Sequence, residues 1–296
     1  MTRVAVVGRG DVSVVHLAAI EKLGAKLVGA GEQPDVVHVC TPHDQHVPVA
    51  IEALENGAHV FLEKPVAHTV AEAERLVTAA KRFPHRKVGV CLQNRYNTAS
   101  EVARRRLADL GEIRGASATV LWHRGQSYYR AKPWRGAKAR SGGGVLINQA
   151  IHTIDLLQWL VGDVIAVTGH AGRYSGYDID VEDTAGLILD HANGARSVLF
   201  ATVANATDSR VTIEIVTEKA TLSLRGDLTI SHEDGTVEVI PERRASTGGR
   251  AYWGASHELI IADFYRSLAG PEPFWIGPAE ALRSQQIIDA VYRQNH

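Results

Sequence analysis

Apolar positions in the first third of the chain follow two alternating patterns. Short apolar runs predict buried strands, whereas segments whose apolar residues recur every three or four positions predict amphipathic helices. The predicted strands lie at 4–7, 36–40, 59–62 and 87–92, and the predicted helices lie at 14–23, 47–56 and 71–82. Strands that alternate with helices build a mostly parallel sheet whose ligands bind at the carboxyl ends of the strands. Gly8, Thr41 and Glu63 each follow such a strand, so we expect them to line one crevice.

The pattern changes after residue 95. Segments that alternate with a period of two predict strands, and Asn193-Gly194 and Asp234-Gly235 are typical of hairpin turns. The predicted order is a helix at 100–110, a strand at 112–123, a Gly- and Arg-rich loop at 124–144, a helix at 145–161, strands at 164–170, 184–189, 195–203, 211–217, 220–225, 228–231 and 237–240, and helices at 256–268 and 278–293. We therefore predict an α/β domain at 1–95 and an α+β domain at 96–296 with an open, largely antiparallel sheet.

Composition fits an enzyme-sized chain with a sizeable core. Its 296 residues suggest about two domains, and a hydrophobic content of 45% is ordinary for a globular protein. The formal net charge is −1, and acidic and basic residues are mixed along the chain. This pattern does not indicate binding to nucleic acid or to an anionic membrane. The chain opens on an apolar strand rather than a signal peptide, and no apolar run approaches the ~18 residues of a spanning helix. Because Cys40 and Cys91 lie in apolar segments, we expect buried, unpaired thiols and a cytoplasmic protein.

A glycine-containing turn follows the first predicted strand. The dinucleotide fingerprint has the form Gly-x-Gly-x-x-Gly, and Gly8, Gly10 and Ser13 occupy its three positions here. The first two glycines permit a tight turn and a close approach of a pyrophosphate to the start of a helix, and serine is small enough for the third position. An acidic residue about twenty positions further on holds the adenosine ribose in such sites. Glu32 is the candidate, which favours NAD and leaves NADP as an alternative.

A second group of candidate residues lies on the predicted helix at 145–161, which follows Ser141-Gly142-Gly143-Gly144. Asn148, His152 and Asp155 are spaced by four and three residues, which places them on one face of an α-helix. The ordinary pKa of histidine lies near neutrality, so His152 can accept a proton during an oxidation and return it during a reduction. Asp155 fits a substrate-binding, an orienting or a structural role.

Taken together, the glycine turn, Glu63-Lys64-Pro65 and the segment at 141–155 resemble the Gfo/Idh/MocA family, which includes glucose-fructose oxidoreductase and inositol dehydrogenase. The resemblance extends to Gln93-Asn94-Arg95-Tyr96-Asn97, to Tyr128-Tyr129-Arg130-Ala131-Lys132-Pro133-Trp134-Arg135-Gly136 and to Val181-Glu182-Asp183-Thr184-Ala185. It implies a Rossmann-like first domain and an NAD(P)-dependent dehydrogenase that acts on a small sugar, nucleotide sugar or cyclitol.

The resemblance assigns catalysis to Lys64, His152 and Asn148. A lysine ammonium at position 64 can hydrogen-bond the hydroxyl being oxidised and stabilise the alkoxide-like charge that develops as hydride leaves. Many members of the family have aspartate where this chain has Asn148. Asparagine can orient a hydroxyl but cannot raise the pKa of a neighbouring histidine, so the acid/base role falls on His152.

The same resemblance distributes further residues between cofactor and substrate. The expected cofactor-binding residues are Gly8, Gly10, Ser13, Glu32, Thr41, His46, Glu63, Lys64, Trp134 and Arg135. The expected substrate-binding residues are Lys64, Arg95, Arg124, Tyr128, Asn148, His152 and Asp155. The aromatic and arginine residues have a structural alternative, in which they anchor a long loop to the antiparallel sheet. We expect no metal, because no acidic or cysteine cluster completes a ligand set with His43 and His46.

The first domain is shorter than in the family. Only Gln33-Pro34-Asp35 separate Glu32 from the strand at 36–40, where the family has a helix, a strand and a second helix. A link from the top of one strand to the bottom of a parallel neighbour must retrace about 17 Å at ~3.4 Å per residue. Either residues 26–30 run in a non-standard way or the sheet stops near its first strand. In both cases we expect a shortened Rossmann-like domain with an intact central sheet and a weaker, more exposed cofactor site.

Other functions and the assembly state remain open at this stage. A redox-neutral glycosidase resembles the same family, but it retains its cofactor and so requires tight binding. A non-catalytic sensor or assembly subunit is motivated by the short link, Ser13 and Asn148, whereas the presence of Lys64 and His152 favours an enzyme. The family covers the open sheet with a second subunit, so we expect a homodimer or homotetramer.

Overall fold

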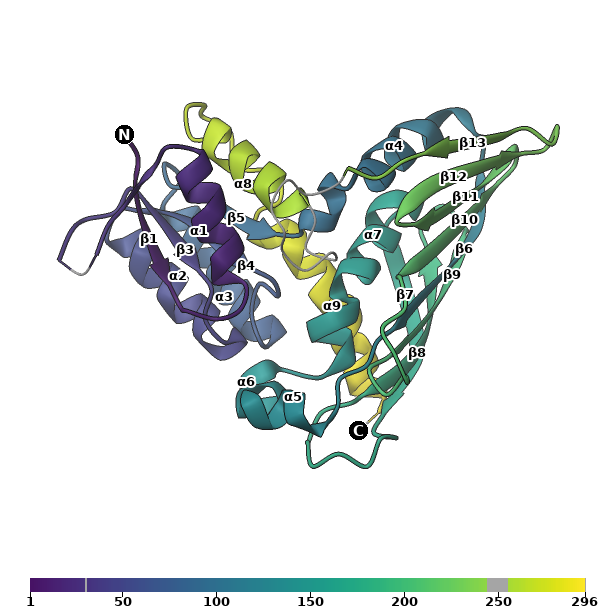
Figure 1. The fold of residues 1–296 in the computed structure, drawn as a ribbon, viewed down its shortest axis with the longest axis horizontal. Coiled ribbons are helices and arrows are strands. Elements are labelled where there is room, and N and C mark those ends of the chain that lie inside the picture. The colour runs from purple at the N-terminus through teal and green to yellow at the C-terminus, as the bar shows by residue number, and fades with distance from the viewer. Residues whose placement is uncertain (30, 244–254, 296) are drawn as a thin grey trace. The chain divides into compact units, whose positions relative to one another are not determined.

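A computed structural model describes residues 1–29, 31–243 and 255–295 of the chain (Figure 1). The contacts divide the protein into two compact units, of which the first comprises Met1–Gln93 and Ala245–Gln285 and the second comprises Asn94–Arg244 and Gln286–His296. The division thus falls two residues before the predicted boundary. The C-terminal part of the chain is divided between the two units. The tertiary contacts of residues 255–285 place them with the first unit, which sequence periodicity cannot indicate. In the described part of the chain, no helix has both the length and the apolar composition needed to cross a bilayer.

The first unit is built on a parallel sheet with the order β2-β1-β3-β4-β5 among the described residues. Its strands are β1 (Arg3–Val7), β2 (Lys26–Leu27), β3 (Val36–Val39), β4 (His59–Glu63) and β5 (Val88–Cys91), and its helices are α1 (Ser13–Lys22), α2 (His46–Glu55), α3 (Val70–Arg82) and α8 (Ser256–Ser267). All four residues of β3 and of β5 are buried, as expected for central strands covered on both faces. Gly89 of β5 allows α8 to pack closely, since a Cβ there would lie 2.7 Å from the Phe264 ring.

The short link after Glu32 is accommodated because β2 has only two residues. Leu27 pairs with Val4 on one side of β1, and Val36 pairs with the same Val4 on the other side. The paired residues on both sides of the link therefore lie level with the first residues of β1, and little strand length has to be retraced. Asp35 pairs with Arg3 at 2.8 Å, which holds the end of the link at the amino-terminal edge. The sheet ends at β2, and the central strands are intact.

The second unit contains a larger sheet with the order β13-β12-β11-β10-β6-β9-β8-β7. These strands are β6 (Ile113–Leu121), β7 (Val164–Gly172), β8 (Thr184–His191), β9 (Arg196–Thr202), β10 (Thr212–Thr217), β11 (Ala220–Arg225), β12 (Asp227–His232) and β13 (Val237–Ile240). Neighbouring strands are antiparallel except for β6 and β9, which are parallel. The predicted fold class, a Rossmann-like α/β domain joined to a largely antiparallel α+β domain, is confirmed.

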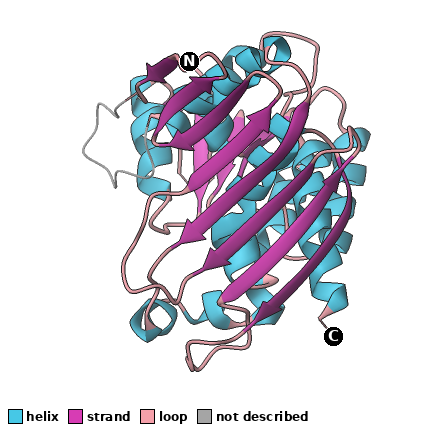
Figure 2. Ribbon diagram, turned by 90° about the vertical axis from the view of Figure 1, so that its right-hand side faces the viewer, coloured by secondary structure: helices cyan, strands magenta, loops and turns pink. Residues whose placement is uncertain are grey.

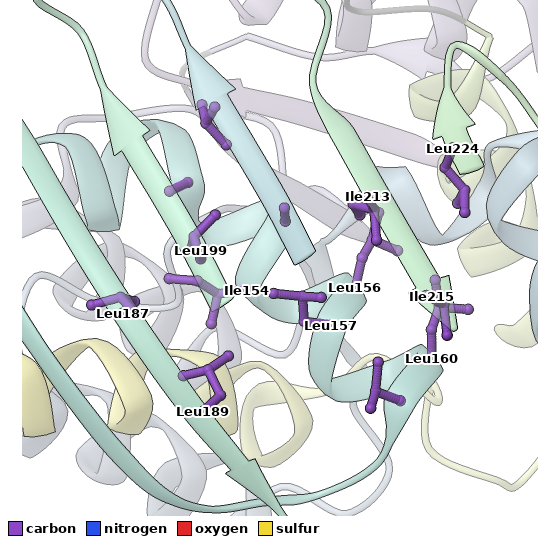
Figure 3. Close-up of a cluster of buried hydrophobic side chains, with 14 of the residues drawn as sticks. Ile154, Leu156, Leu157, Leu160, Leu187, Leu189, Leu199, Ile213, Ile215 and Leu224 are labelled. Atoms are coloured by element: carbon purple, nitrogen blue, oxygen red, sulfur yellow. The ribbon is translucent and has the colours of Figure 1, made fainter. Parts of the chain in front are cut away.

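Helices cover one face of this second sheet. They are α4 (Thr98–Arg106), α7 (Ile151–Val161) and the end of α9 (Pro278–Gln294). Figure 3 shows leucine and isoleucine side chains of α7 packed against inward-facing residues of β8, β9 and β10. On the opposite face, turned toward the viewer in Figure 2, no helix formed by the described residues of this unit is seen. There Ile188, Val198 and Phe200 are 42%, 47% and 47% exposed.

Two segments differ from the predicted elements. Residues 124–144 are not a plain loop, because they contain α5 (Gln126–Ala131), a 3-10 turn at Pro133–Gly136 and α6 (Lys138–Ser141). The predicted helix at 145–161 begins with one turn of π-helix at Leu146–Ala150, and α7 follows it. A π turn widens the helix locally and is frequent at functional sites. Asn148 therefore lies in the π turn, and His152 lies at the start of α7.

Candidate active site

Three adjacent parallel strands end at predicted cofactor residues. Gly8 follows β1, Thr41 lies two residues after β3, and Glu63 ends β4. Gly8 has a φ of +96°, and a Cβ at this position would lie 2.5 Å from the backbone carbonyl of Cys40. Only glycine permits this close approach between the ends of β1 and β3. The structure thus places these residues along one carboxyl edge of the sheet.

The start of α1 follows the Gly8 turn. The Ser13 hydroxyl donates to the carbonyl of Gly10 at 2.7 Å and closes the turn. No side chain caps the first turn of α1, and that turn holds no acidic residue. The positive end of the helix dipole favours an anion at a helix start, so this turn suits a phosphate.

His46 joins the segments that follow β3 and β4. Its Nε2 lies 3.0 Å from the carbonyl oxygen of Thr41, and its Nδ1 lies 2.7 Å from that of Pro65. Burial lowers the pKa of His46, against a smaller opposing effect of these two carbonyls. The buried Oγ1 of Thr41 has no hydrogen-bond partner among the described residues. Thr41 therefore offers a hydroxyl at the carboxyl edge that the protein itself does not satisfy.

Lys64 follows β4 directly, and the Lys64–Pro65 peptide bond is cis. Its side chain is partly exposed, whereas Glu63 is buried. Burial raises the pKa of Glu63, but His16, His257 and Lys64 together hold the pKa well below its usual range. Glu63 accepts a hydrogen bond from His16 Nε2 at 2.9 Å. The carboxylate at the end of β4 is thus ionised, buried and surrounded by cationic groups.

One set of potential metal ligands occurs in the described part of the chain. The ligand atoms of His16, Glu63 and Cys91 lie within 4.8 Å of one another. A metal would have to displace protons from His16 and from the Cys91 thiol. Burial raises the pKa of the Cys91 thiol well above its ordinary value, and the pKa of His16 is also raised. Both ring nitrogens of His16 also already bond within the protein, to His38 and to Glu63, and we assign no metal to this cluster.

In the second unit, Tyr128 is the centre of a polar and aromatic cluster. Its hydroxyl oxygen lies 3.4 Å from the amide nitrogens of both Asn148 and Gln149. The guanidinium of Arg135 lies 4.1 Å from the centre of the Tyr128 ring, and that of Arg124 lies 5.7 Å from it. The predicted residues Tyr128, Asn148, Arg135 and Arg124 are therefore brought together. Gln149 was not predicted, although an amide beside Asn148 was a visible signal.

Arg95 and Asp155, both predicted to contact substrate, bind each other. Arg95 donates from Nε and Nη2 to the two carboxylate oxygens of Asp155 at 2.8 and 2.6 Å. Both side chains are 1% exposed, and the Trp159 ring lies 5.5 Å from the guanidinium. A two-point buried ion pair of this kind fixes the 3-10 turn at Gln93–Tyr96, which precedes α4, to α7. The structure thus favours the structural alternative for Asp155.

The glycine-rich entry to the π turn is held by Glu182, a residue without a predicted role. The Glu182 carboxylate accepts hydrogen bonds from the amides of Gly144 at 2.8 Å and Leu146 at 3.0 Å, and from the Tyr292 hydroxyl at 2.7 Å. A Cβ on Gly144 would lie 1.8 Å from the carbonyl oxygen of Glu182. The glycine is therefore required by packing, and Glu182 positions the segment that carries Asn148.

The remaining predicted residues lie as follows. Trp134 is partly exposed in the 3-10 turn, 6.0 Å from the guanidinium of Arg135, and His152 is partly buried at the second position of α7. Glu32 is exposed and pairs with Lys26 at 3.1 Å on the short link. The adjacent Gln33 donates to the carbonyl of Asn56, which follows α2 at the amino-terminal edge. Glu32 thus bonds Lys26 and the amide of Gly29, both on the link, which favours a position away from the Gly8 turn.

Two family models match most of the chain. Residues 25–90 match the oxidoreductase family with an NAD-binding Rossmann fold, and residues 97–223 match the Gfo/Idh/MocA C-terminal domain. The putative UDP-kanosamine synthase oxidoreductase subunit of Amycolatopsis mediterranei is 30% identical, over 93% of this chain and 81% of that protein. The D-apiose dehydrogenase of Paraburkholderia graminis is 28% identical, over 89% and 71%. Some other relatives are matched over only 42% to 56% of their own length.

Solved structures show the same architecture. The WlbA dehydrogenase from Bordetella pertussis, determined in complex with NADH and UDP-GlcNAcA, superimposes with a TM-score of 0.84 and 26% identity. The match covers 99% of this chain and 95% of that chain. Both family models, the fold and the relative that matches over 93% of this chain agree, and the chain therefore belongs to the Gfo/Idh/MocA family of oxidoreductases.

Proposed function

We propose that this protein is an NAD-dependent dehydrogenase that oxidises a secondary hydroxyl group of a sugar, a nucleotide sugar or a cyclitol. The observation that carries the proposal is the carboxyl edge of the first sheet. There Gly8, Thr41 and Lys64 follow three adjacent parallel strands, in a chain whose family is a family of oxidoreductases. Ligands of open parallel sheets bind at this edge.

The residues at this edge fit a dinucleotide. The uncapped start of α1 suits a pyrophosphate, Gly8 leaves room beside it, and the unsatisfied Thr41 hydroxyl suits a ribose or amide group. NAD, when bound, accepts the hydride that leaves the substrate carbon. We propose that Gly8, Gly10, Ser13, Thr41, His46, Glu63 and Lys64 of the first unit hold it.

The chemical roles follow from residue type. The Lys64 ammonium donates a hydrogen bond to the substrate hydroxyl oxygen and stabilises the negative charge that grows on it. His152 accepts the hydroxyl proton and returns it in the reverse direction. Asn148, held near the Tyr128 hydroxyl, orients a substrate hydroxyl without adding charge. The hydride thus leaves the carbon of the alcohol and the proton leaves its oxygen, which yields a ketone.

The Tyr128 cluster supports a substrate with an anionic group. An aromatic ring packs against the C–H surface of a pyranose, and Arg124 and Arg135 suit a carboxylate or a phosphate. Two similar proteins point the same way, because one is a putative UDP-kanosamine synthase oxidoreductase subunit and the other was determined in complex with UDP-GlcNAcA. We propose nucleotide sugars as the first substrates to test.

The test is NADH formation by the purified protein on a panel of substrates. The panel contains UDP-linked sugars with and without a carboxylate, free sugars and free cyclitols, each with NAD. We expect NADH absorbance to rise with at least one member, most strongly with a UDP-linked sugar. Release of aglycone from an aryl glycoside without net NADH would instead identify a redox-neutral glycosidase. Absence of both activities would count against an enzyme.

The uncovered face of the second sheet supports a homo-oligomer. It carries the exposed Ile188, Val198 and Phe200, together with a depression of about 410 Å³ whose lining includes Arg196 and Glu214. Apolar residues combined with charges of both signs can pair with a second copy of the same face. We expect a sedimentation mass that is twice or four times 32.1 kDa. Phe200→Glu should shift it to the single-chain mass, and Leu27→Glu, at an exposed position of β2 in the first unit, should not.

A further inference from the structure

A chain of hydrogen-bonding groups runs through the interior of the first unit to Glu63. The Tyr265 hydroxyl on α8 lies 3.0 Å from Nε2 of His38 on β3. Nδ1 of His38 lies 2.8 Å from Nδ1 of His16 on α1, and Nε2 of His16 lies 2.9 Å from the Glu63 carboxylate. Both histidines are fully buried. The cofactor and substrate assignments use neither of them.

The geometry limits where the protons can be. A carboxylate only accepts, so the Nε2 of His16 must carry a proton. One proton must also lie between the two Nδ1 atoms of His16 and His38, because neither two protons nor none can form a bond at 2.8 Å. If His16 supplies this proton, it is an imidazolium that donates to both neighbours. If His38 supplies it, both rings are neutral and Tyr265 donates to His38.

The surroundings favour the first arrangement. A buried carboxylate is costly unless cationic groups balance it, and neutral His16 would remove the nearest of them, leaving Lys64 and His257, whose Nε2 lies 3.7 Å from Glu63. Burial lowers the pKa of His16, but Cys40 and Glu63 outweigh it and raise the pKa to about 10. Burial and His16 lower the pKa of His38 well below its usual value, so His38 stays neutral and accepts. The titratable or charged groups around His16 are His38 and Cys40 on the β3 side, Glu63 and Lys64 on the β4 side, Cys91 on β5, and His257 and Tyr265 on α8.

We propose that His16 is a buried imidazolium which, held by His38 and Tyr265, neutralises Glu63 and thereby acts as a positioning residue for Lys64. Two cations, His16 and Lys64, then share one carboxylate. If His16 lost its charge, Glu63 would attract the Lys64 ammonium more strongly. The ammonium would be harder to deprotonate and would be drawn toward Glu63 rather than toward a substrate. This inference rests on the proposed role of Lys64, but its tests need neither NAD nor a sugar.

The first readout is the pH dependence of stability of the whole protein. The folded pKa of His16 lies above its unfolded value, so its contribution is complete below about pH 6.5 and is lost as the pH rises to about 10. Across that window, His16 should raise the unfolding equilibrium constant by up to tenfold per pH unit. His16→Gln keeps a neutral donor for Glu63 but lacks the titrating proton, so this slope should disappear. His191→Gln, which replaces a buried histidine of the second unit, should retain the slope.

If His16→Gln does not fold, a double variant allows the same pH dependence of stability to be measured. In His16→Gln/Glu63→Gln a neutral pair replaces the ion pair, and no buried charge is left alone. It should fold, and it too should lack the slope between pH 6.5 and 10. A slope equal to that of the wild type in either variant would show that another group titrates, and it would overturn the charge assigned to His16.

The second readout is the reactivity of Lys64 itself. Competitive labelling of the intact protein with acetic anhydride over a pH series, read by peptide mass spectrometry, gives the midpoint at which each lysine loses its proton. Removal of a neighbouring positive charge should shift the Lys64 midpoint upward by about one pH unit in His16→Gln. The exposed Lys81 in the same samples is the internal control. An unmoved Lys64 midpoint would overturn the positioning role. If both readouts agree with expectation and the protein still oxidises no sugar, the proposed function fails while this inference stands.

Discussion

Lys64→Met should lower kcat by about 100- to 1,000-fold, the loss seen when one preorganised donor to a developing oxyanion is removed. Methionine retains an unbranched apolar side chain but has no ammonium, so the charge on the substrate oxygen loses its partner. Lys64 follows β4 at the carboxyl edge, and the loss should fall on kcat rather than on the affinity for NAD. The measurement is steady-state NADH formation with the best substrate of the panel.

The control for this variant is Lys81→Met, which replaces an exposed lysine near the end of α3. It should keep wild-type kcat, because Lys81 lies far along the chain from the β4 end and faces solvent. Circular dichroism and the unfolding midpoint of Lys64→Met should match those of the wild type. If Lys64→Met retained more than about a tenth of the wild-type kcat, Lys64 would be removed from the proposed mechanism.

Asp155→Ala should destabilise the protein by about 3–5 kcal/mol, since it leaves the buried Arg95 guanidinium without its partner. The two side chains are 1% exposed, so water cannot replace the lost carboxylate. The measurement is urea unfolding, with the free energy of unfolding compared between variant and wild type. Arg95→Met/Asp155→Leu should recover most of the loss, because the double variant leaves no buried charge.

An exposed ion pair of the same unit provides the control. Arg243 donates to Glu101 of α4 at 3.4 Å, and Glu101→Ala should cost at most about 1 kcal/mol. If Asp155→Ala did not destabilise the protein, the substrate-binding role that the helix position of Asp155 suggested would be favoured instead. In that case Asp155→Ala would leave stability nearly unchanged and raise the KM of the sugar substrate.

The strands of both units were predictable because burial imposes a simple pattern. In β3 every residue is buried and the sequence is an unbroken apolar run apart from His38, whereas β8 and β9 alternate between buried and exposed positions. The glycine turn was also visible, because the positive φ of Gly8 and its contact with Cys40 demand the one residue type that the fingerprint names. The family resemblance supplied the rest of the fold.

The short link and the π turn were not predictable from periodicity. Two residues of β2 pair with β1, a length at which an apolar run gives no strand signal. The π turn at Leu146–Ala150 has the composition of an ordinary helix. The Gly144 amide bonds to Glu182, a partner that is distant in sequence and that appears only when the chain folds. Such long-range contacts determine where Asn148 lies.

The partners within buried polar networks were also not predictable from the sequence. Arg95 and Asp155 resembled two separate substrate contacts, because each lies in a segment typical of the family and neither shows its partner. His16 and His38 fall at ordinary positions of a helix and a strand. Only the tertiary structure reveals that their Nδ1 atoms lie 2.8 Å apart and that Nε2 of His16 bonds to Glu63. A histidine in an apolar run is otherwise interpreted as a core residue.

The central claim is that the shortened first domain still binds a nicotinamide dinucleotide through the Gly8 turn and Thr41. Calorimetric titration of the purified protein with NAD, NADH, NADP and NADPH tests it most directly. Because Glu32 pairs with Lys26 away from the turn, Glu32→Gln should bind as the wild type does. We predict micromolar affinity for NAD or NADH. The absence of binding by any of the four dinucleotides up to millimolar concentration would contradict the claim, and with it the dehydrogenase activity.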